Sequence, residues 1–183
     1  MMYELPQALE IAGKSYKIRS DFRAELDIIA ALNDPALSNQ EKAIVLLQIL
    51  YPDWEEITDY QEAIRQAMLF IGGGEADGGK AQKPVLMDWE QDFRFLVSPV
   101  NRALGFECRQ AEYLHWWTFL SAYMEIGDCT FAQMVSIRNK KAKGKKLEKW
   151  EQEYYRENRS VIDIKKRLTE SEQTFIENLL NSD

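Results

Sequence analysis

His115, the chain's only histidine, is the residue best suited to chemistry, because an imidazole can act as a general base or bind a metal ion. The sequence has no Cys-x-x-Cys or His-Glu-x-x-His spacing, so any metal site would consist mainly of carboxylates. A nucleophile motif of the Gly-x-Ser-x-Gly type is also missing from the sequence. We therefore expect no enzyme activity and no cofactor, and we expect His115 to form a local hydrogen bond.

A glycine-rich segment partly matches a phosphate-binding loop. Residues 74–80 read Gly-x-x-x-x-Gly-Lys, but Ala81 stands where the hydroxyl that binds Mg²⁺ is required. A phosphate-binding loop also leads into a helix N-terminus, whereas Pro84 follows this segment closely. Five glycines among residues 72–83 instead predict a flexible linker or a long loop.

Asp88, Glu90 and Asp92 have the spacing of the first ligands in a calcium-binding EF-hand loop. That loop needs glycine at its sixth position and a bidentate acid at its twelfth, which here are Phe93 and Pro99. Acids in the first turn of a helix are also stabilised by the positive end of the helix dipole. These three acids therefore predict the start of a helix and not a calcium site.

Length and composition predict a protein that folds without disulfides or metals. With 183 residues, 45% of them hydrophobic, the chain can bury one substantial core or two small ones. Its net charge of −7 argues against a general nucleic-acid binder, because such proteins present a basic surface to phosphates. We find no signal peptide and no apolar run of roughly 20 residues, so we expect a cytoplasmic protein that does not engage membranes. Cys108 and Cys129 are expected to be reduced.

The apolar pattern predicts a mainly α fold, a bundle-like helical domain with a short N-terminal β-hairpin. Residues 1–71 are expected to hold that hairpin, which alternates apolar and polar positions around Gly13, followed by three helices. Residues 72–84 are the expected flexible connection. Residues 85–183 are expected to form a second helical region that packs with the first.

Capping residues mark where the helices should begin. The expected N-caps are Ser20 or Asp21, then Ser38 with Glu41 in a capping box, Asp59 and Asp88. The expected inward faces hold Phe22, Leu26, Ile29, Ala30 and Leu32 in the first helix and Ile64, Met68 and Ile71 in the third. Later helices are expected at about residues 130–141, 147–156 and 169–180.

A central helix is expected over residues 109–126, with His115 inside it. Two adjacent tryptophans follow His115, and neighbouring helical residues point about 100° apart, so one ring can pack inward while the other meets a partner. Tryptophan is enriched at binding hot spots, although core packing explains the same residues. The aromatic candidates for partner binding are Trp116, Trp117, Phe119 and Tyr123.

Lysines gather after the helix expected at residues 130–141. Residues 139–167 carry 11 basic and 5 acidic side chains, whereas residues 1–71 carry 6 basic and 12 acidic ones. The group consists of Lys140, Lys141, Lys143, Lys145 and Lys146. It is either a solvated helix end favoured by the dipole or a docking segment for an acidic partner or a nucleic-acid backbone. Interleaved acids in residues 148–157 weaken the nucleic-acid interpretation.

Several short sequence motifs of this chain occur together in one phage family. They are Leu5-Pro6 before the hairpin, Asp21-Phe22-Arg23, the glycine-rich insert, His115-Trp116-Trp117-x-Phe119-Leu120 and Ile137-Arg138. Over nearly its whole length the chain resembles the bacteriophage gene-product-fifteen family of tailed phages and prophages. The resemblance implies a protein encoded just ahead of the tape-measure protein, in the position of tail assembly chaperones. It implies no specific functional residues.

The expected function is a non-catalytic tail assembly chaperone in the host bacterial cytoplasm. The resemblance implies that its partners are the aggregation-prone tape-measure protein and the tail-tube subunits, and self-association is also possible. One alternative is a structural tail or head–tail connector component that stays in the virion. A second alternative is a nucleic-acid-binding regulator that uses residues 139–167, which the acidic chain as a whole disfavours.

Overall fold

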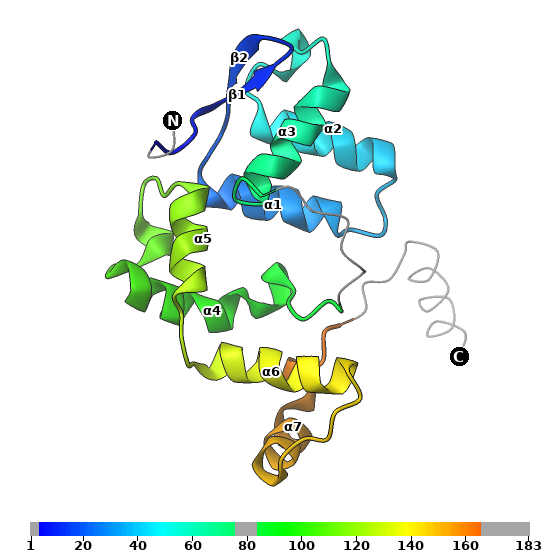
Figure 1. Ribbon diagram of the computed structural model, residues 1–183, viewed down its shortest axis with the longest axis vertical. Coiled ribbons are helices and arrows are strands. Elements are labelled where there is room, and N and C mark those ends of the chain that lie inside the picture. The colour runs from blue at the N-terminus through cyan, green and yellow to red at the C-terminus, as the bar shows by residue number, and fades with distance from the viewer. Residues whose placement is uncertain (1–3, 76–83, 166–183) are drawn as a thin grey trace, which may run out of the picture. The chain divides into compact units, whose positions relative to one another are not determined.

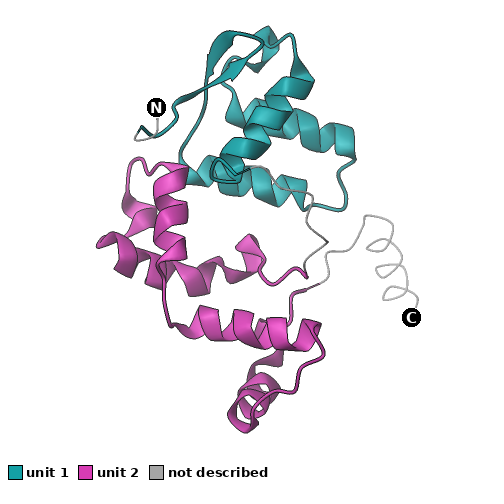
Figure 2. Cartoon of the chain, viewed as in Figure 1, with its two compact units in different colours: residues 1–76, 166–183 teal, residues 77–165 magenta. Residues whose placement is uncertain are grey.

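The computed structural model describes residues 4–75 and 84–165 (Figure 1). The chain divides into two compact units (Figure 2). Residues 4–75 belong to the first, here called the N-terminal unit, and residues 84–165 to the second, the C-terminal unit. Most of the expected linker and the whole of the helix expected at residues 169–180 lie outside the described residues.

The N-terminal unit begins with the expected hairpin. Strands β1 (Ala8–Ile11) and β2 (Lys14–Lys17) are antiparallel, with Leu9 opposite Tyr16. The two turn residues, Ala12 and Gly13, both have positive φ, at 49° and 81°. Two-residue hairpin turns of this kind require left-handed backbone at both positions, which glycine adopts without strain. The predicted hairpin is confirmed.

Three helices complete the N-terminal unit, as the sequence predicted. They are α1 (Phe22–Leu32), α2 (Asn39–Leu50) and α3 (Tyr60–Ile71), with a short 3₁₀ turn, η1 (Trp54–Glu56), between the last two. The side chains of Asp21, Ser38 and Asp59 each accept a backbone N–H at the helix start, and Glu41 completes the capping box of Ser38. Local capping chemistry therefore set these three starts.

The inward faces of α1 and α3 differ from the prediction. The buried residues are Phe22, Glu25 and Ile28 in α1 and Ala63, Ala67 and Phe70 in α3. The predicted Leu26 and Ile29 are half-buried, and Met68 is 47% exposed. Both helices carry apolar residues around much of their circumference, so the 3.6-residue period did not select one face. The alanines of α3 let neighbouring elements approach closely, which a rule based on large apolar side chains overlooks.

The elements of the C-terminal unit, over its described residues, are all helices. Its elements are α4 (Trp89–Leu104), the 3₁₀ turn η2 (Cys108–Gln110), α5 (Trp116–Met124), α6 (Thr130–Ala142) and α7 (Lys149–Ile162). Asp88 caps α4 as predicted, and Gly105 ends it with φ +80°. Helix α4 packs against both α5 and α6, while α7 packs against α6. The mainly α fold class is therefore confirmed.

The continuous helix predicted over residues 109–126 is wrong. The chain forms η2, then runs without helix to His115, which caps α5 from outside. The side-chain ring of His115 accepts the N–H of Trp117, and this cap starts the helix at Trp116. Helix α7 extends to Ile162, beyond the predicted end near residue 156.

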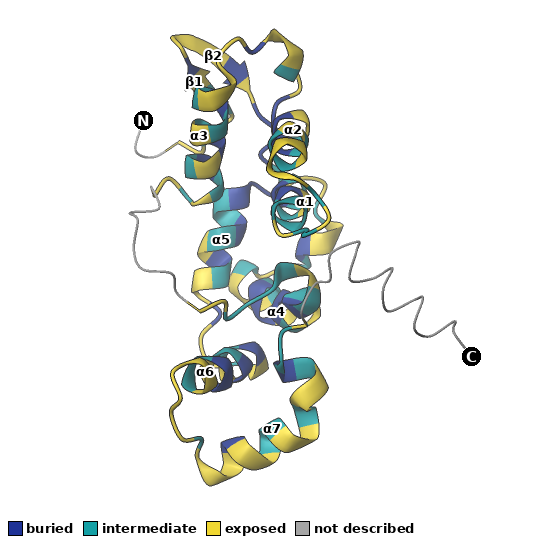
Figure 3. Cartoon of the chain, turned by 90° about the vertical axis from the view of Figure 1, so that its right-hand side faces the viewer, coloured by how far each residue is buried: buried dark blue, intermediate teal, exposed yellow. Residues whose placement is uncertain are grey.

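The helices differ in how many of their residues are buried (Figure 3). Helix α6 buries Phe131, Met134, Ile137 and Arg138, whereas α7 buries only Glu151 and Ile162. Both cysteines are free thiols, and Cys129 serves as the N-cap of α6. Across residues 4–75 and 84–165, no helix combines the length and the apolar character needed to cross a membrane.

Candidate functional site

Four aromatic rings join α4 to α5. Trp89, in the first turn of α4, has its ring centroid 5.9 Å from Trp116, 6.1 Å from Phe119 and 5.1 Å from Tyr123. Trp116 and Phe119 stack with centroids 5.8 Å apart and 15° between their planes. Both are buried, and Tyr123 is half-buried. Three of the four predicted aromatic candidates therefore belong to a cluster within the C-terminal unit, and sequence reasoning missed Trp89 at its centre.

The fourth aromatic candidate, Trp117, lies on another face of α5. Trp117, Leu120 and Met124 follow the i, i+3, i+7 spacing that places side chains along one side of a helix. Trp117 and Leu120 are half-buried, and Met124 is 74% exposed. Helix α5 thus has apolar residues on two sides, because the buried residues Trp116, Phe119 and Ala122 extend around a different side of the helix. We call residues 117, 120 and 124 the outer face of α5.

His115 has a structural role that its geometry explains. It is buried, its Nδ1 accepts the backbone N–H of Trp117 at 3.0 Å, and its ring meets the Trp117 ring edge-on at 6.2 Å. An Nδ1 that accepts a hydrogen bond must be unprotonated, so the neutral ring carries its proton on Nε2. Within the described residues, no group of three or more histidine, cysteine or acidic side chains could hold a metal ion.

Arg138 holds three segments of the C-terminal unit together. Its guanidinium forms a bidentate pair with Asp92 of α4, at 2.6 and 2.9 Å, and both side chains are buried. It also donates to the carbonyls of Leu86, Val161 and Ile162, at 3.0, 3.3 and 2.5 Å. A guanidinium has five N–H groups, so each of them has an acceptor. Asp92 also receives the N–H of Asp88, which closes the first turn of α4.

The lysine group divides into two parts. Lys140 forms a two-oxygen ion pair with the buried Glu151 of α7, at 2.7 Å to each oxygen, and this hydrogen-bonded ammonium lowers the pKa of Glu151. Lys141 contacts the hydroxyl and the ring of Tyr155 and pairs with Asp163 at 2.7 Å. These two lysines attach α7 to α6.

The other three lysines, Lys143, Lys145 and Lys146, are exposed. In the portion of the chain that the structure describes, they form no ion pair. A sequence reading cannot distinguish these lysines from the two that serve α7, because all five lie within seven consecutive residues.

A family described as Bacteriophage Gp15 protein matches residues 1–164. The chain belongs to this Gp15 family. No curated protein and no solved structure matches it. Membership of the Gp15 family indicates a bacteriophage structural or assembly protein, and the predicted family is confirmed.

The structure gives physical roles to the residues that carried the Gp15 resemblance. In this Gp15-family chain, Asp21 caps α1, His115 caps α5, and Trp116 and Phe119 pack against Trp89. Arg138 links the C-terminal end of α7 to α4. Most of the motif therefore maintains the fold, and Trp117 is its half-buried aromatic residue on the outer face of α5.

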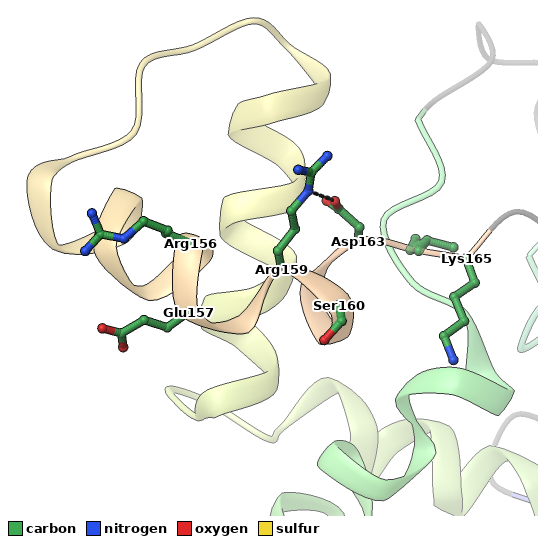
Figure 4. Close-up of a pocket in the computed structure, with 7 residues that line it drawn as sticks. Arg156, Glu157, Arg159, Ser160, Asp163 and Lys165 are labelled. Atoms are coloured by element: carbon green, nitrogen blue, oxygen red, sulfur yellow. Dashed lines mark hydrogen bonds and ion pairs between the residues drawn. The ribbon is translucent and has the colours of Figure 1, made fainter.

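An open hollow lies at the C-terminal end of α7 (Figure 4). It measures about 570 Å³ and is lined by charged side chains of both signs, Arg156, Glu157, Arg159, Asp163 and Lys165, with Ser160 and Ile164. Arg159 is turned toward Asp163 and donates to it at 3.2 Å (Figure 4). Three of these charged side chains are basic and two are acidic, and the hollow is open to solvent, whereas small-molecule sites are usually enclosed clefts.

Proposed function

We propose that this Gp15-family protein is a non-catalytic tail assembly chaperone that covers an amphipathic helix of the tape-measure protein in the host bacterial cytoplasm. The observation that carries the proposal is the outer face of α5, where Trp117 and Leu120 lead to the exposed Met124. An amphipathic helix buries its apolar face in an apolar surface of a partner, and methionine adapts its shape to varied partners.

The packing of the inner side of α5 supports this role. Trp116 and Phe119 are packed against Trp89, so α5 is anchored to α4 by its inner side. An anchored helix presents its outer side chains with little loss of conformational entropy on binding. Family membership agrees with a role in particle assembly or structure, and tail-tube subunits would be further partners of the same complex.

Co-purification with the tape-measure protein tests the proposal. We expect the native chain to form a complex and Trp117→Ala to weaken it by roughly 10- to 100-fold, the loss of about 2 kcal/mol typical of a tryptophan hot spot. Met124→Ser should weaken binding less. The matched control is Met68→Ser, because Met68 is an exposed methionine on α3 of the N-terminal unit. Absence of a complex with the native chain would refute the proposal.

Mass spectrometry of purified phage particles separates a chaperone from a structural component. A chaperone leaves the finished tail, so this chain should be missing from particles that contain the tape-measure protein. A fixed copy number in those particles would instead support the connector alternative. DNA binding that falls steeply with salt and disappears when Lys143, Lys145 and Lys146 are neutralised would support the nucleic-acid alternative.

A further inference from the structure

Two exposed patches of opposite charge occur on the two units. The first, here called the lysine turn, is residues 143–150, with Lys143, Lys145, Lys146 and Lys149 against one acid, Glu148. The second, here called the acidic corner, is residues 53–60, with four acids and no basic residue. Each patch also exposes one aromatic ring, Trp150 at 53% and Tyr60 at 45%.

The lysine turn connects two helices that the preceding lysines attach to each other. Lys140 and Lys141 precede the turn and bind Glu151 and Asp163, which fixes where α6 ends and α7 begins. The turn itself therefore projects its lysines between two attached helices. Trp150, in the first helical turn of α7, is exposed, and Figure 3 shows that most of α7 is exposed.

The acidic corner is held in place by the hairpin. The carbonyl of Glu56 accepts the hydroxyl of Tyr16 at 3.1 Å, and its carboxylate pairs with Lys14 at 2.9 Å. Asp59 caps α3. Asp53 and Glu55 are exposed and form no ion pair with the described residues, so their charge faces solvent.

We propose that copies of this protein associate head to tail, with the lysine turn of one copy on the acidic corner of the next. Complementary charge selects the contact, and Trp150 and Tyr60 supply its apolar centre. Because the two surfaces differ, the contact is heterologous, so it produces either a closed ring or an open chain of subunits. A second copy fits better than a nucleic acid, because the net charge of −7 repels phosphates.

Sedimentation velocity of the nuclease-treated full chain tests this proposal. We expect association at about 20 mM salt that weakens at least tenfold at about 300 mM, because screening shortens the reach of exposed charges. Lys145→Glu/Lys146→Glu should abolish association at low salt. The control Lys42→Glu/Arg94→Glu changes the net charge equally, outside both patches, and should still associate. Trp150→Ala should raise the dissociation constant by roughly tenfold.

A charge swap makes the test specific. Asp53→Lys/Glu55→Lys should also be monomeric alone, and mixing it with the Lys145→Glu/Lys146→Glu chain should restore association, since each variant then meets a complementary patch. A monomer at low salt for the native chain overturns the proposal. It is also overturned if association is indifferent to salt, if the control loses it equally, or if the mixture stays monomeric. The proposed contact with the tape-measure protein involves the outer face of α5, outside both patches. The co-purification result is therefore independent of the sedimentation result.

Discussion

Glu25 makes the stability of the N-terminal unit depend on pH. It lies on the inner face of α1 with Phe22 and Ile28, is fully buried, and has no hydrogen-bond partner at either carboxylate oxygen. The nearby buried hydroxyl of Tyr51 donates instead to the carbonyl of Ala63. Burial therefore raises the pKa of Glu25 from 4.5 to about 8, because a carboxylate loses its hydration in the core.

The sign and size of the effect follow from proton linkage. The folded chain keeps a proton on Glu25 that the unfolded chain releases above pH 4.5, so folding stability is full below that pH and falls as pH rises toward 8. Each pH unit corresponds to about 1.4 kcal/mol, so the loss is about 3 kcal/mol at pH 7 and about 5 kcal/mol above pH 8. Tyr51 stays neutral over this range, because burial and then the charges of Glu25 and Glu62 raise its pKa.

The measurement compares native chain with Glu25→Gln by urea unfolding at pH 5, 7 and 9, followed by circular dichroism. Glutamine resembles the protonated acid, so the two free energies of unfolding should agree within about 1 kcal/mol at pH 5. The variant should then be more stable by about 3 kcal/mol at pH 7 and about 5 kcal/mol at pH 9. Asp27→Asn, at an exposed acid of the same helix, should show no such trend. A difference between native and Glu25→Gln that stays constant from pH 5 to pH 9 would refute this reasoning.

Three further outcomes follow from the geometry. Arg138→Met should lower the free energy of unfolding by about 3–5 kcal/mol, because it leaves Asp92 buried without its partner, and the double change Arg138→Met/Asp92→Leu should recover much of that loss in urea unfolding. Gly13→Ala should lower the stability measured by thermal unfolding by about 1 kcal/mol, since the φ of +81° strains any residue with a Cβ atom. The cause would be backbone strain and not a clash, because an added Cβ atom meets no other atom within 4 Å. His115→Ala should lower the free energy of unfolding by about 1 kcal/mol, and His115→Asn should lower it much less, because asparagine can also accept the N–H of Trp117. Equal losses for the two variants would show that the cap is unimportant.

The starts of the helices were predictable because capping is local. Asp21, Ser38, Asp59 and Asp88 each lie two or three residues before the backbone N–H that they accept. The hairpin was predictable for the same reason, since Gly13 and its alternating flanks specify a two-residue turn. The extent of α5 was not predicted, because His115 is rarely a capping residue and the apolar run around it hides the interruption.

The sequence only partly distinguished residues that could contact a partner from residues that maintain the fold. Trp116 and Trp117 are chemically identical neighbours, and the position of Trp89 on α4 determines which ring enters the aromatic cluster. Likewise, Lys140 and Lys143 differ only in that Glu151 of α7 lies within reach of the first. A residue's role in these cases depends on a partner far away in the chain.

The sequence alone determined the helical class, the hairpin, most helix starts and the family, because each depends on short-range patterns of capping, turn chemistry and apolar periodicity. Tertiary structure decided which face of α1 and α3 is buried, which groups Arg138 binds, and which lysines remain exposed. The physical reason is distance: Arg138 meets acceptors that lie 46, 52 and 24 residues away at Asp92, Leu86 and Ile162, and no local pattern encodes which segments packing will bring together.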